Sequence, residues 1–281
     1  MDGQSKGKPP INIRKKNMSD LFSTGVRPAI DEYLKKKSEE VRNYGEYWSA
    51  SSAGYCMRLN IMKRLGVPKV PELEDNATQT RIFEAGHIFH EWLQRITKDA
   101  GLSIASEVEL QDEKLMIRGH FDDLILQDGK LLLYDYKTAH SASFKFKKRQ
   151  TEIGQYHKMQ LGTYMYMWRN PDVWLPKNDW LLMKDKLTEA RILSISKDDL
   201  RMDEKQLIWT PALQKEVYEY WATLNGYWKA KKIPKCTCLE IDGGFMGRRS
   251  AKGKVYNDFF WQDEPCSLVW YAKCKAEGKL K

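Results

Sequence analysis

The sequence predicts an α/β fold, and two observations carry that prediction. Residues 118–138 contain two apolar runs on either side of Asp128-Gly129, a residue pair typical of the tight turn of a β-hairpin. Helices are predicted on both sides of this hairpin in the chain, at residues 78–100 and 151–169. A strand pair between two long helices is typical of a domain in which helices pack against a sheet.

The composition is that of a globular protein with an excess of positive charge. Of the 281 residues, 42% are hydrophobic and 30% are charged, and no apolar run is long enough to span a membrane. The net charge of +9 favours an anionic partner, most simply nucleic acid, although a merely soluble basic protein has the same surplus. Residues 1–17 are basic without the apolar core of a signal peptide, which predicts a disordered arm and a cytoplasmic protein.

The segments before the hairpin are predicted to be mainly helical. Helices are expected at residues 20–42, 51–65 and 78–100, followed by a strand at 103–111. Ser51 or Ser52 is the expected cap of the second helix, and Gly66 and Gly101 are expected to end the second and third. His90 flanks the apolar stripe of the third helix, where a histidine is more often structural than a ligand.

The segments after the hairpin alternate between helix and strand. A basic loop is expected at residues 138–150, a helix at 151–169, strands at 180–183 and 190–195 as a second hairpin, and a helix at 211–231. The predicted division is an arm (1–17), a main domain (18–234) and a cysteine-containing C-terminal segment (235–281) that packs back on the N-terminal helices.

The hairpin register places charged side chains on one face of the strand pair. Side chains alternate between faces, and a two-residue loop sets which residues lie opposite each other. The pairs expected on one face are Leu126 with Leu131, Leu124 with Leu133, and Asp122 with Asp135. Lys137 lies two residues beyond Asp135 on that face. Because a bound divalent cation would remove the repulsion between opposed carboxylates, the pattern predicts a metal-dependent phosphodiesterase site; the alternative is a surface hairpin with scattered charges.

Two basic stretches are candidate DNA contacts. The first is the loop that carries Lys147, Lys148 and Arg149, which either steers phosphates toward the acidic face or is a solvated turn. The second is the Gly-rich stretch GGFMGRRSAKGK at residues 243–254, which either contacts DNA or is disordered.

Four short motifs occur in order along the chain. They are Gly86-His87-Ile88-Phe89-His90, Gly119-His120-Phe121-Asp122, Asp135-Tyr136-Lys137 and Gln160-Leu161-Gly162-Thr163-Tyr164. On their helix–strand–strand–helix pattern they resemble the RecB-type branch of the PD-(D/E)XK nuclease superfamily. The likeness extends to the nucleases of CRISPR spacer acquisition and to phage exonucleases of the same build. It implies a restriction-endonuclease-like α/β core, in which a mixed central sheet is flanked by helices.

The resemblance also implies a role for each motif residue. Mg²⁺ or Mn²⁺ would be held by His90, Asp122, Asp135 and the backbone carbonyl of Tyr136. Lys137 would orient the attacking water and stabilise charge on the phosphate. Gln160 and Tyr164 would lie beside the site and hold the DNA backbone. His87 and His120 fall outside the motif positions and are not expected to be ligands.

The five cysteines extend the resemblance in part. An odd number of cysteines without a secretion signal favours thiols or metal ligands over disulfides. Several family members hold an iron–sulfur cluster on one cysteine before the core and three after it. Here the resemblance implies Cys56, Cys266, Cys274 and one of Cys236 or Cys238, holding a [4Fe–4S] cluster or, alternatively, zinc. The alternative is five unrelated thiols.

The function predicted from these features is metal-dependent hydrolysis of DNA, by an exonuclease acting on DNA ends in recombination, repair or phage DNA processing. A non-catalytic DNA-binding module of the same fold is the main alternative, and the intact Asp122, Asp135 and Lys137 argue against it. A structure-specific endonuclease would use the same chemistry. Helicase, recombinase or integrase partners are consistent with such a nuclease.

Overall fold

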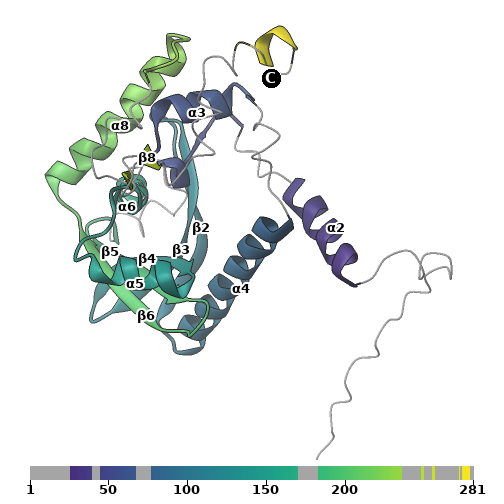
Figure 1. The fold of residues 1–281 in the computed structure, drawn as a ribbon. Helices are drawn as coiled ribbons and strands as arrows, with labels where there is room; N and C mark the ends of the chain where they lie inside the picture. The colour runs from purple at the N-terminus through teal and green to yellow at the C-terminus, as the bar shows by residue number, and fades with distance from the viewer. Residues whose placement is uncertain are drawn as a thin grey trace, which may run out of the picture. The chain divides into compact units, whose positions relative to one another are not determined.

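The computed structural model describes residues 26–39, 45–67, 77–169, 183–235, 248–249, 255–256, 272 and 274–278 (Figure 1). The expected arm, residues 1–17, lies outside these ranges. The chain divides into two compact units, residues 1–41 with 76–84 and residues 42–75 with 85–281. In the first unit, α2 (Val26–Glu39) and the start of α4 (Ala77–Asp99) are joined by an ion pair between Asp31 and Arg81.

The second unit is built on a mixed six-stranded sheet. Its strands are β1 (Trp48–Ser49), β2 (Ser103–Asp112), β3 (Ile117–Gln127), β4 (Lys130–Ala139), β5 (Leu187–Ser196) and β6 (Met202–Ile208). The order is β1-β3-β4-β5-β6, and β2 also pairs with β3. The β1–β3 and β4–β5 pairs are parallel and the others are antiparallel, so the expected mixed sheet is confirmed.

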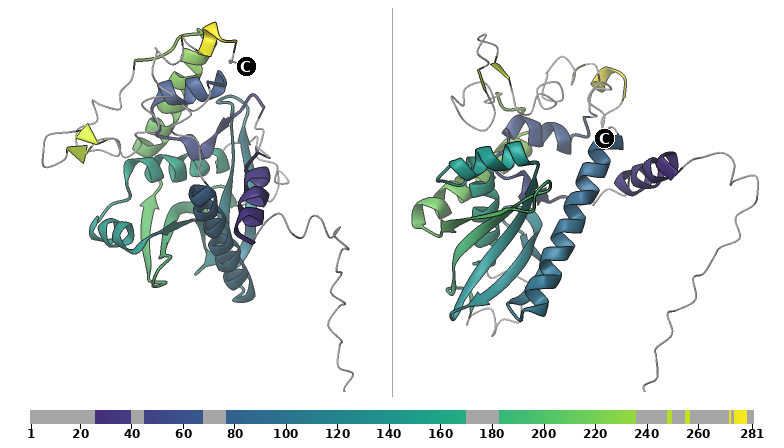
Figure 2. Two further views of the ribbon diagram at one scale, coloured as in Figure 1. Left: turned by 45° about the vertical axis from the view of Figure 1, so that its right-hand side comes forward. Right: turned by 60° about the horizontal axis from the view of Figure 1, so that its bottom comes forward.

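Helices cover both faces of this sheet (Figure 2). The helices of the second unit are the 3₁₀ helix η1 (Ala50–Ser52), α3 (Met57–Arg64), the later part of α4, α5 (Ser141–Arg149), α6 (Gln155–Trp168) and α8 (Pro211–Lys229). On one face, α6 and α8 pack over the main core, which includes Leu131 and Leu133. On the other face, Leu93 of α4 packs with Leu132. In the described residues, no helix has the length and apolar character needed to cross a membrane.

The β3–β4 hairpin has the predicted turn and the predicted leucine pairs. Asp128 and Gly129 both have positive φ, 51° and 74°, as a two-residue type I′ turn requires. Leu126 lies opposite Leu131 and Leu124 opposite Leu133. The pairing of β3 with β4 ends at Asp123 and Tyr134, one pair before the predicted opposition of Asp122 and Asp135.

Strand β3 changes partner at this point. One of its edges is followed by β2 from residue 117 to 125, whereas the opposite edge pairs with β1 at residues 117–118 and with β4 at residues 123–127. Among the described strands, none pairs with residues 119–122 on that opposite edge. Strand β4 continues beside β5 as far as Ala139. The two hairpin strands therefore part at Asp122. The backbone N–H groups of β4 beyond this point can bond with a side chain of β3 in place of its backbone.

The predicted helix at 51–65 begins later than expected. Residues 50–52 form η1, and α3 starts at Met57 with Cys56 as its N-cap, so neither Ser51 nor Ser52 caps it. Gly54 lies between them with a φ of 78°, a left-handed conformation that a continuous helix cannot contain. Gly66 and Gly101, at φ 71° and 69°, follow the last helical turns as predicted.

The predicted basic loop at 138–150 is wrong for most of its length, because residues 141–149 form α5. Phe144 is 1% exposed and anchors this helix to the protein. Lys205 supports its C-terminal end, since Nζ donates to the carbonyl oxygens of Lys147 and Gln150 at 2.5 and 2.6 Å. A short helix with one buried side chain has too weak an apolar period to be recognised from sequence.

The predicted second hairpin is also wrong. The strand expected at 190–195 exists as β5, but its two edges pair with β4 and β6. Residues 180–182 lie outside the described part of the chain and Met183 is not in a strand. Strand β6 was missed because its alternation is between exposed and half-buried positions, as in an edge strand with few apolar residues. In the Gly-rich stretch, β7 (Arg248–Arg249) pairs with β8 (Val255–Tyr256).

Candidate active site

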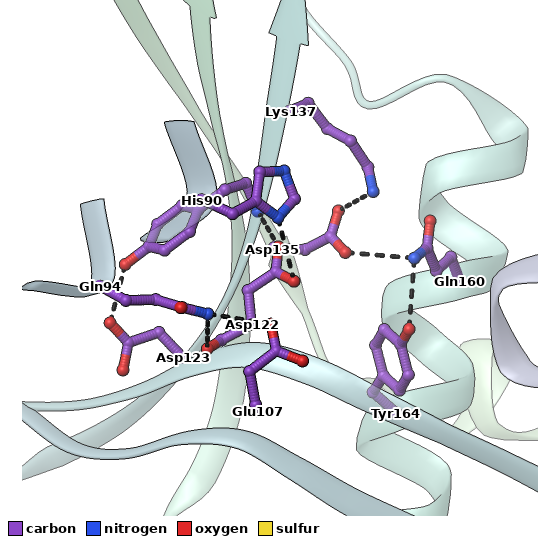
Figure 3. Close-up of polar contacts among 10 residues, drawn as sticks. His90, Gln94, Glu107, Asp122, Asp123, Asp135, Lys137, Gln160 and Tyr164 are labelled. Carbon is purple, nitrogen blue, oxygen red and sulfur yellow. Dashed lines mark hydrogen bonds and ion pairs between the residues drawn. The ribbon is translucent and has the colours of Figure 1, made fainter. Parts of the chain in front are cut away.

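Six of the predicted site residues come together where β3 and β4 part (Figure 3). They are contributed by α4 (His90), β3 (Asp122), β4 (Asp135 and Lys137) and α6 (Gln160 and Tyr164). Hydrogen bonds and ion pairs join them into two groups, one centred on each aspartate. The structure thus assembles, from four elements, residues that the sequence separates by up to 74 positions (164 − 90).

The Asp122 carboxylate takes the place of a ladder partner for β4. Its Oδ2 accepts a hydrogen bond from the backbone N–H of Tyr136 at 2.5 Å. Its Oδ1 lies 3.5 Å from Nδ1 of His90. Burial disfavours the imidazolium, but the hydrogen bond and charge of Asp122 outweigh that effect and raise the pKa of His90. The raised pKa favours the protonated imidazole, whose charge would offset that of Asp122.

The Asp135 carboxylate is buried, with 3% of the residue exposed. Its Oδ2 lies 2.6 Å from Nζ of Lys137, and its Oδ1 accepts a hydrogen bond from Nε2 of Gln160 at 3.1 Å. Burial and the nearby Asp122 raise the pKa of Asp135 to about 6 despite the lysine. Burial disfavours the charge on Lys137 as well, but Asp135 and Asp122 raise its pKa, so the ammonium keeps its proton.

Gln160 and Tyr164 lie beneath the site and are 4% and 3% exposed. Nε2 of Gln160 donates to Asp135 and also lies 3.3 Å from the Tyr164 hydroxyl, so this pair holds Asp135 in place. Oε1 of Gln160 is buried and has no hydrogen-bond partner among the described residues. It is an acceptor beside the site that a water or a protonated group can use. The contact of Gln160 and Tyr164 with DNA remains a prediction.

The donor set suits a hard divalent cation. Two carboxylates and an imidazole converge on the gap between β3 and β4, and carboxylate oxygens are the preferred ligands of Mg²⁺ and Mn²⁺. In the described residues, no three His, Cys, Asp or Glu side chains form a closed metal-binding group. The two carboxylates instead contact Lys137, His90 and the backbone N–H of Tyr136. A cation can take over charge compensation from His90 and Lys137. A role for the Tyr136 carbonyl remains a prediction.

The two other histidines near the motifs do not join this group. His87 is exposed on α4. His120 directs Nε2 toward Oε2 of Glu109, at 3.2 Å. Their absence from the predicted ligand set remains a prediction.

Three polar residues at the site were not assigned a role from the sequence. Gln94, one helical turn after His90, donates from Nε2 to the carbonyl of Asp122 and to Oε1 of Glu107, both at 3.0 Å. Glu107 is exposed and has a φ of 52° in the middle of β2. Asp123 is fully buried directly after Asp122. The four-residue spacing of His90 and Gln94 places both on one side of a helix, so the sequence could have indicated that Gln94 lies at the site. The positions of Glu107 and Asp123 depend on how β2 packs, which the sequence does not indicate.

The basic residues of the second half of α5 differ in their surroundings. Burial, together with the charges of Lys137 and Lys205, lowers the pKa of Lys147, which is half-buried. Lys148 and Arg149 are exposed in the last turn of α5. These two are available to a polyanion, and Lys147 extends the positive charge toward the site.

Comparison of the sequence with family models identifies the superfamily of this chain. Residues 99–238 match the model of the PD-(D/E)XK nuclease superfamily, and this range includes the hairpin, Gln160 and Tyr164. The chain belongs to the PD-(D/E)XK nuclease superfamily. Its six-stranded mixed sheet with flanking helices is the fold of that superfamily. His90 lies outside the matched residues, so its place in the nuclease site depends on the geometry alone.

Solved structures of low sequence identity are similar to this nuclease. SSO0001 is 16% identical with a TM-score of 0.45, and the match covers 78% of this chain and 96% of SSO0001. An alkaline exonuclease from Laribacter hongkongensis is 13% identical with a TM-score of 0.45, covering 66% and 89%. A phage-related exonuclease from Haemophilus somnus 129PT is 13% identical with a TM-score of 0.31, covering 77% and 88%. No curated protein matches the chain significantly.

Two of the five cysteines lie in the described part of the nuclease. Cys56 occupies the N-cap position of α3, and Cys274 packs with Met62 near the end of that helix; both side chains are buried. Nε of Arg58, in the first turn of α3, donates to the carbonyl of Pro234 at 2.7 Å. This contact holds the chain beside α3 two residues before Cys236. Cys236, Cys238 and Cys266 lie outside the described residues.

Proposed function

We propose that this nuclease is a metal-dependent deoxyribonuclease that hydrolyses phosphodiester bonds, acting as an exonuclease on DNA ends. The observation that carries the proposal is the convergence of His90, Asp122, Asp135 and Lys137 on the gap where β3 and β4 part. The two acids, which come from diverging strands, supply oxygen ligands for a cation. The lysine, which retains its proton, supplies the positive charge that phosphodiester hydrolysis requires. Mg²⁺ or Mn²⁺ is the proposed cofactor.

Each side chain has a separate task in this mechanism. A divalent cation bound by His90, Asp122 and Asp135 would lower the pKa of water and neutralise charge on the phosphate. Lys137, whose raised pKa keeps it protonated, orients the water and stabilises the negative charge that develops on phosphate oxygens. Because it holds its proton, Lys137 acts as a donor rather than as a general base. Gln160 keeps the Asp135 carboxylate turned toward the gap.

The exonuclease mode is tested with end-labelled linear DNA and closed circular DNA of the same sequence, each with Mg²⁺ or Mn²⁺. We expect cleavage of the linear DNA from its ends and an intact circle. Cleavage of the circle would favour a structure-specific endonuclease. DNA binding without cleavage of either substrate, under all metal conditions, would favour the non-catalytic module. The Asp135→Ala variant is the control for contaminating nucleases.

A four-cysteine metal site is the second part of the proposal. Cys56 caps α3, Cys274 packs against the same helix, and Arg58 holds the chain near Cys236; these contacts favour ligands that come from both ends of the chain. Anaerobically purified protein should be brown and contain about four irons per chain if the cluster is cubane-type. Colourless protein with stoichiometric zinc would replace the cluster with zinc. Metal-free folded protein with all five thiols alkylated would contradict both.

A further inference from the structure

A buried carboxylate lies directly behind the proposed metal site. Asp123 is 0% exposed, and no basic side chain among the described residues hydrogen-bonds it. Instead it accepts four hydroxyl groups, two on each oxygen, so all of its acceptor positions are used. The donors are Ser103 (2.5 Å) and Ser106 (3.2 Å) on Oδ1, and Thr97 (2.6 Å) and Tyr136 (2.8 Å) on Oδ2. We call these five residues the Asp123 clasp.

Strand β2 is distorted in a way that serves this carboxylate. Ser103 and Ser106 are three positions apart, so in a regular strand their side chains would point to opposite faces. The pairing of β2 with β3 shifts by one residue between Ser103 and Ala105, which brings both hydroxyls to Asp123. The next residue, Glu107, has a φ of 52°. The irregular backbone is therefore confined to the stretch that meets Asp122 and Asp123.

The clasp joins the elements that carry the proposed metal ligands. His90, Gln94 and Thr97 lie on one side of α4, since they are four and three residues apart. His90 contacts the carboxylate of Asp122, Gln94 its carbonyl, and Thr97 the carboxylate of Asp123. Tyr136 of β4 donates its backbone N–H to Asp122 and its hydroxyl to Asp123.

We propose that Asp123 is a positioning residue for the cation site. It fixes α4 and β4 against β3, so that His90, Asp122 and Asp135, which come from these three elements, lie within reach of one ion. This inference rests on the proposed function and adds a residue to it. Partners behind the ligands set metal affinity because they fix the orientation of the ligands themselves. Asparagine cannot replace Asp123, because its amide group would face two of the hydroxyl donors without accepting from them.

The test measures Mn²⁺ binding by calorimetry, in the absence of DNA, for the full chain and three variants. Asp123→Asn should raise the Mn²⁺ dissociation constant by about 10- to 100-fold, the range seen for residues behind metal ligands. Tyr136→Phe removes one donor and should raise it less. Asp112→Asn is the matched control, because Asp112 is a buried β2 aspartate, 2% exposed, that accepts from the backbone N–H of Leu115 outside the site. It should lower the melting temperature and leave Mn²⁺ affinity unchanged.

An unchanged dissociation constant in folded Asp123→Asn and Tyr136→Phe would overturn the inference, and so would an equal rise in Asp112→Asn. If Asp123→Asn does not fold, Tyr136→Phe decides. Wild-type protein that binds Mn²⁺ but cleaves no DNA would contradict the proposed function. The Mn²⁺ dissociation constants of the variants would still decide the role of Asp123. Wild-type protein that binds no Mn²⁺ would overturn the inference together with the proposed cofactor.

Discussion

At the scale of the residue, the site is a balance of charges. Two carboxylates in a buried gap would repel each other, and the metal-free protein offsets them with Lys137 on Asp135 and His90 on Asp122. The balance is incomplete, since burial and the neighbouring Asp122 still raise the pKa of Asp135. A divalent cation held in this gap would be attracted by both carboxylates and would compete with the proton on His90.

Removing either charged member of the Asp135–Lys137 pair should stop catalysis without unfolding the protein. Asp135→Ala deletes a cation ligand, and we expect no measurable cleavage. Lys137→Ala deletes the donor to the phosphate, and we expect a loss of about 10²- to 10³-fold in rate. The measurement is cleavage of end-labelled linear DNA with saturating Mn²⁺, alongside melting curves. Asp199→Ala, at an exposed turn, is the control that should retain full activity. Wild-type rates in Asp135→Ala would exclude the mechanism.

Mn²⁺ affinity should rise with pH. The cation binds ionised Asp135, whose pKa is about 6, so below that pH a proton competes and the affinity falls by up to about tenfold per pH unit. The raised pKa of His90 adds a second proton to be released. The same group has the opposite effect on the metal-free fold: because its folded pKa exceeds the unfolded value, Asp135 contributes stability that grows as the pH falls through 6 toward 4. Calorimetry from pH 5 to 8 checks the first effect, and a constant affinity would contradict it.

At the scale of the element, the parting of β3 from β4 creates the site. Strand β3 has β1 beside residues 117–118 and β4 beside residues 123–127, and η1 follows β1 directly. Gly119 lies in the interval. A Cβ placed there would lie 2.6 Å from Cβ of Ala50 in η1 and 3.2 Å from Cε1 of Tyr164. The glycine of the second motif is thus required for the close packing of β3 on η1 and α6.

Gly119→Ala should therefore destabilise the fold at the site. Overpacking of this kind typically lowers the free energy of unfolding by about 1–3 kcal/mol, measured here by urea denaturation. Gly226→Ala is the matched control, because a Cβ at this α8 position meets nothing within 4 Å. Alanine there should be neutral or stabilising by up to about 1 kcal/mol. Equal stability of the two variants would show that Ala50 moves aside at no cost.

At the scale of the whole molecule, the excess of positive charge favours a polyanion such as the proposed DNA substrate. The surplus is +9, and α5 presents Lys148 and Arg149 on its surface with Lys147 partly buried toward Lys137. The positive charges of α5 thus extend from the surface toward Lys137. This is the arrangement expected of a path for a phosphate backbone.

DNA affinity should fall steeply with salt, and α5 should account for part of the slope. Replacing Lys147, Lys148 and Arg149 with alanine should make the plot of log affinity against log salt shallower by about 2 units, since each lost phosphate contact removes roughly 0.7–0.9. Replacing the exposed Lys215, Lys229 and Lys231 at α8 removes the same charge and is the control. An equal change in both triple variants would indicate general attraction rather than a path along α5.

The sequence by itself determined the hairpin and the order of the motif residues. Asp128-Gly129 sets a two-residue loop, and alternation then fixes which residues face each other, so the Leu124–Leu133 and Leu126–Leu131 pairs follow from local rules. The long helices α4 and α8 could also be predicted from the sequence, because their apolar periodicity and the residues at their ends are local features. These features depend on interactions between residues close in the chain.

Only the tertiary structure decided where the strands part, that residues 141–149 form a helix, and that β5 pairs with β4 and β6. Each of these depends on contacts between segments distant in sequence. The same holds for Asp123, whose carboxylate looks like a second surface acid in the sequence but is satisfied by hydroxyls from α4, β2 and β4. A buried charge is stable only where the whole fold brings donors to it, and no local pattern of residues records that arrangement.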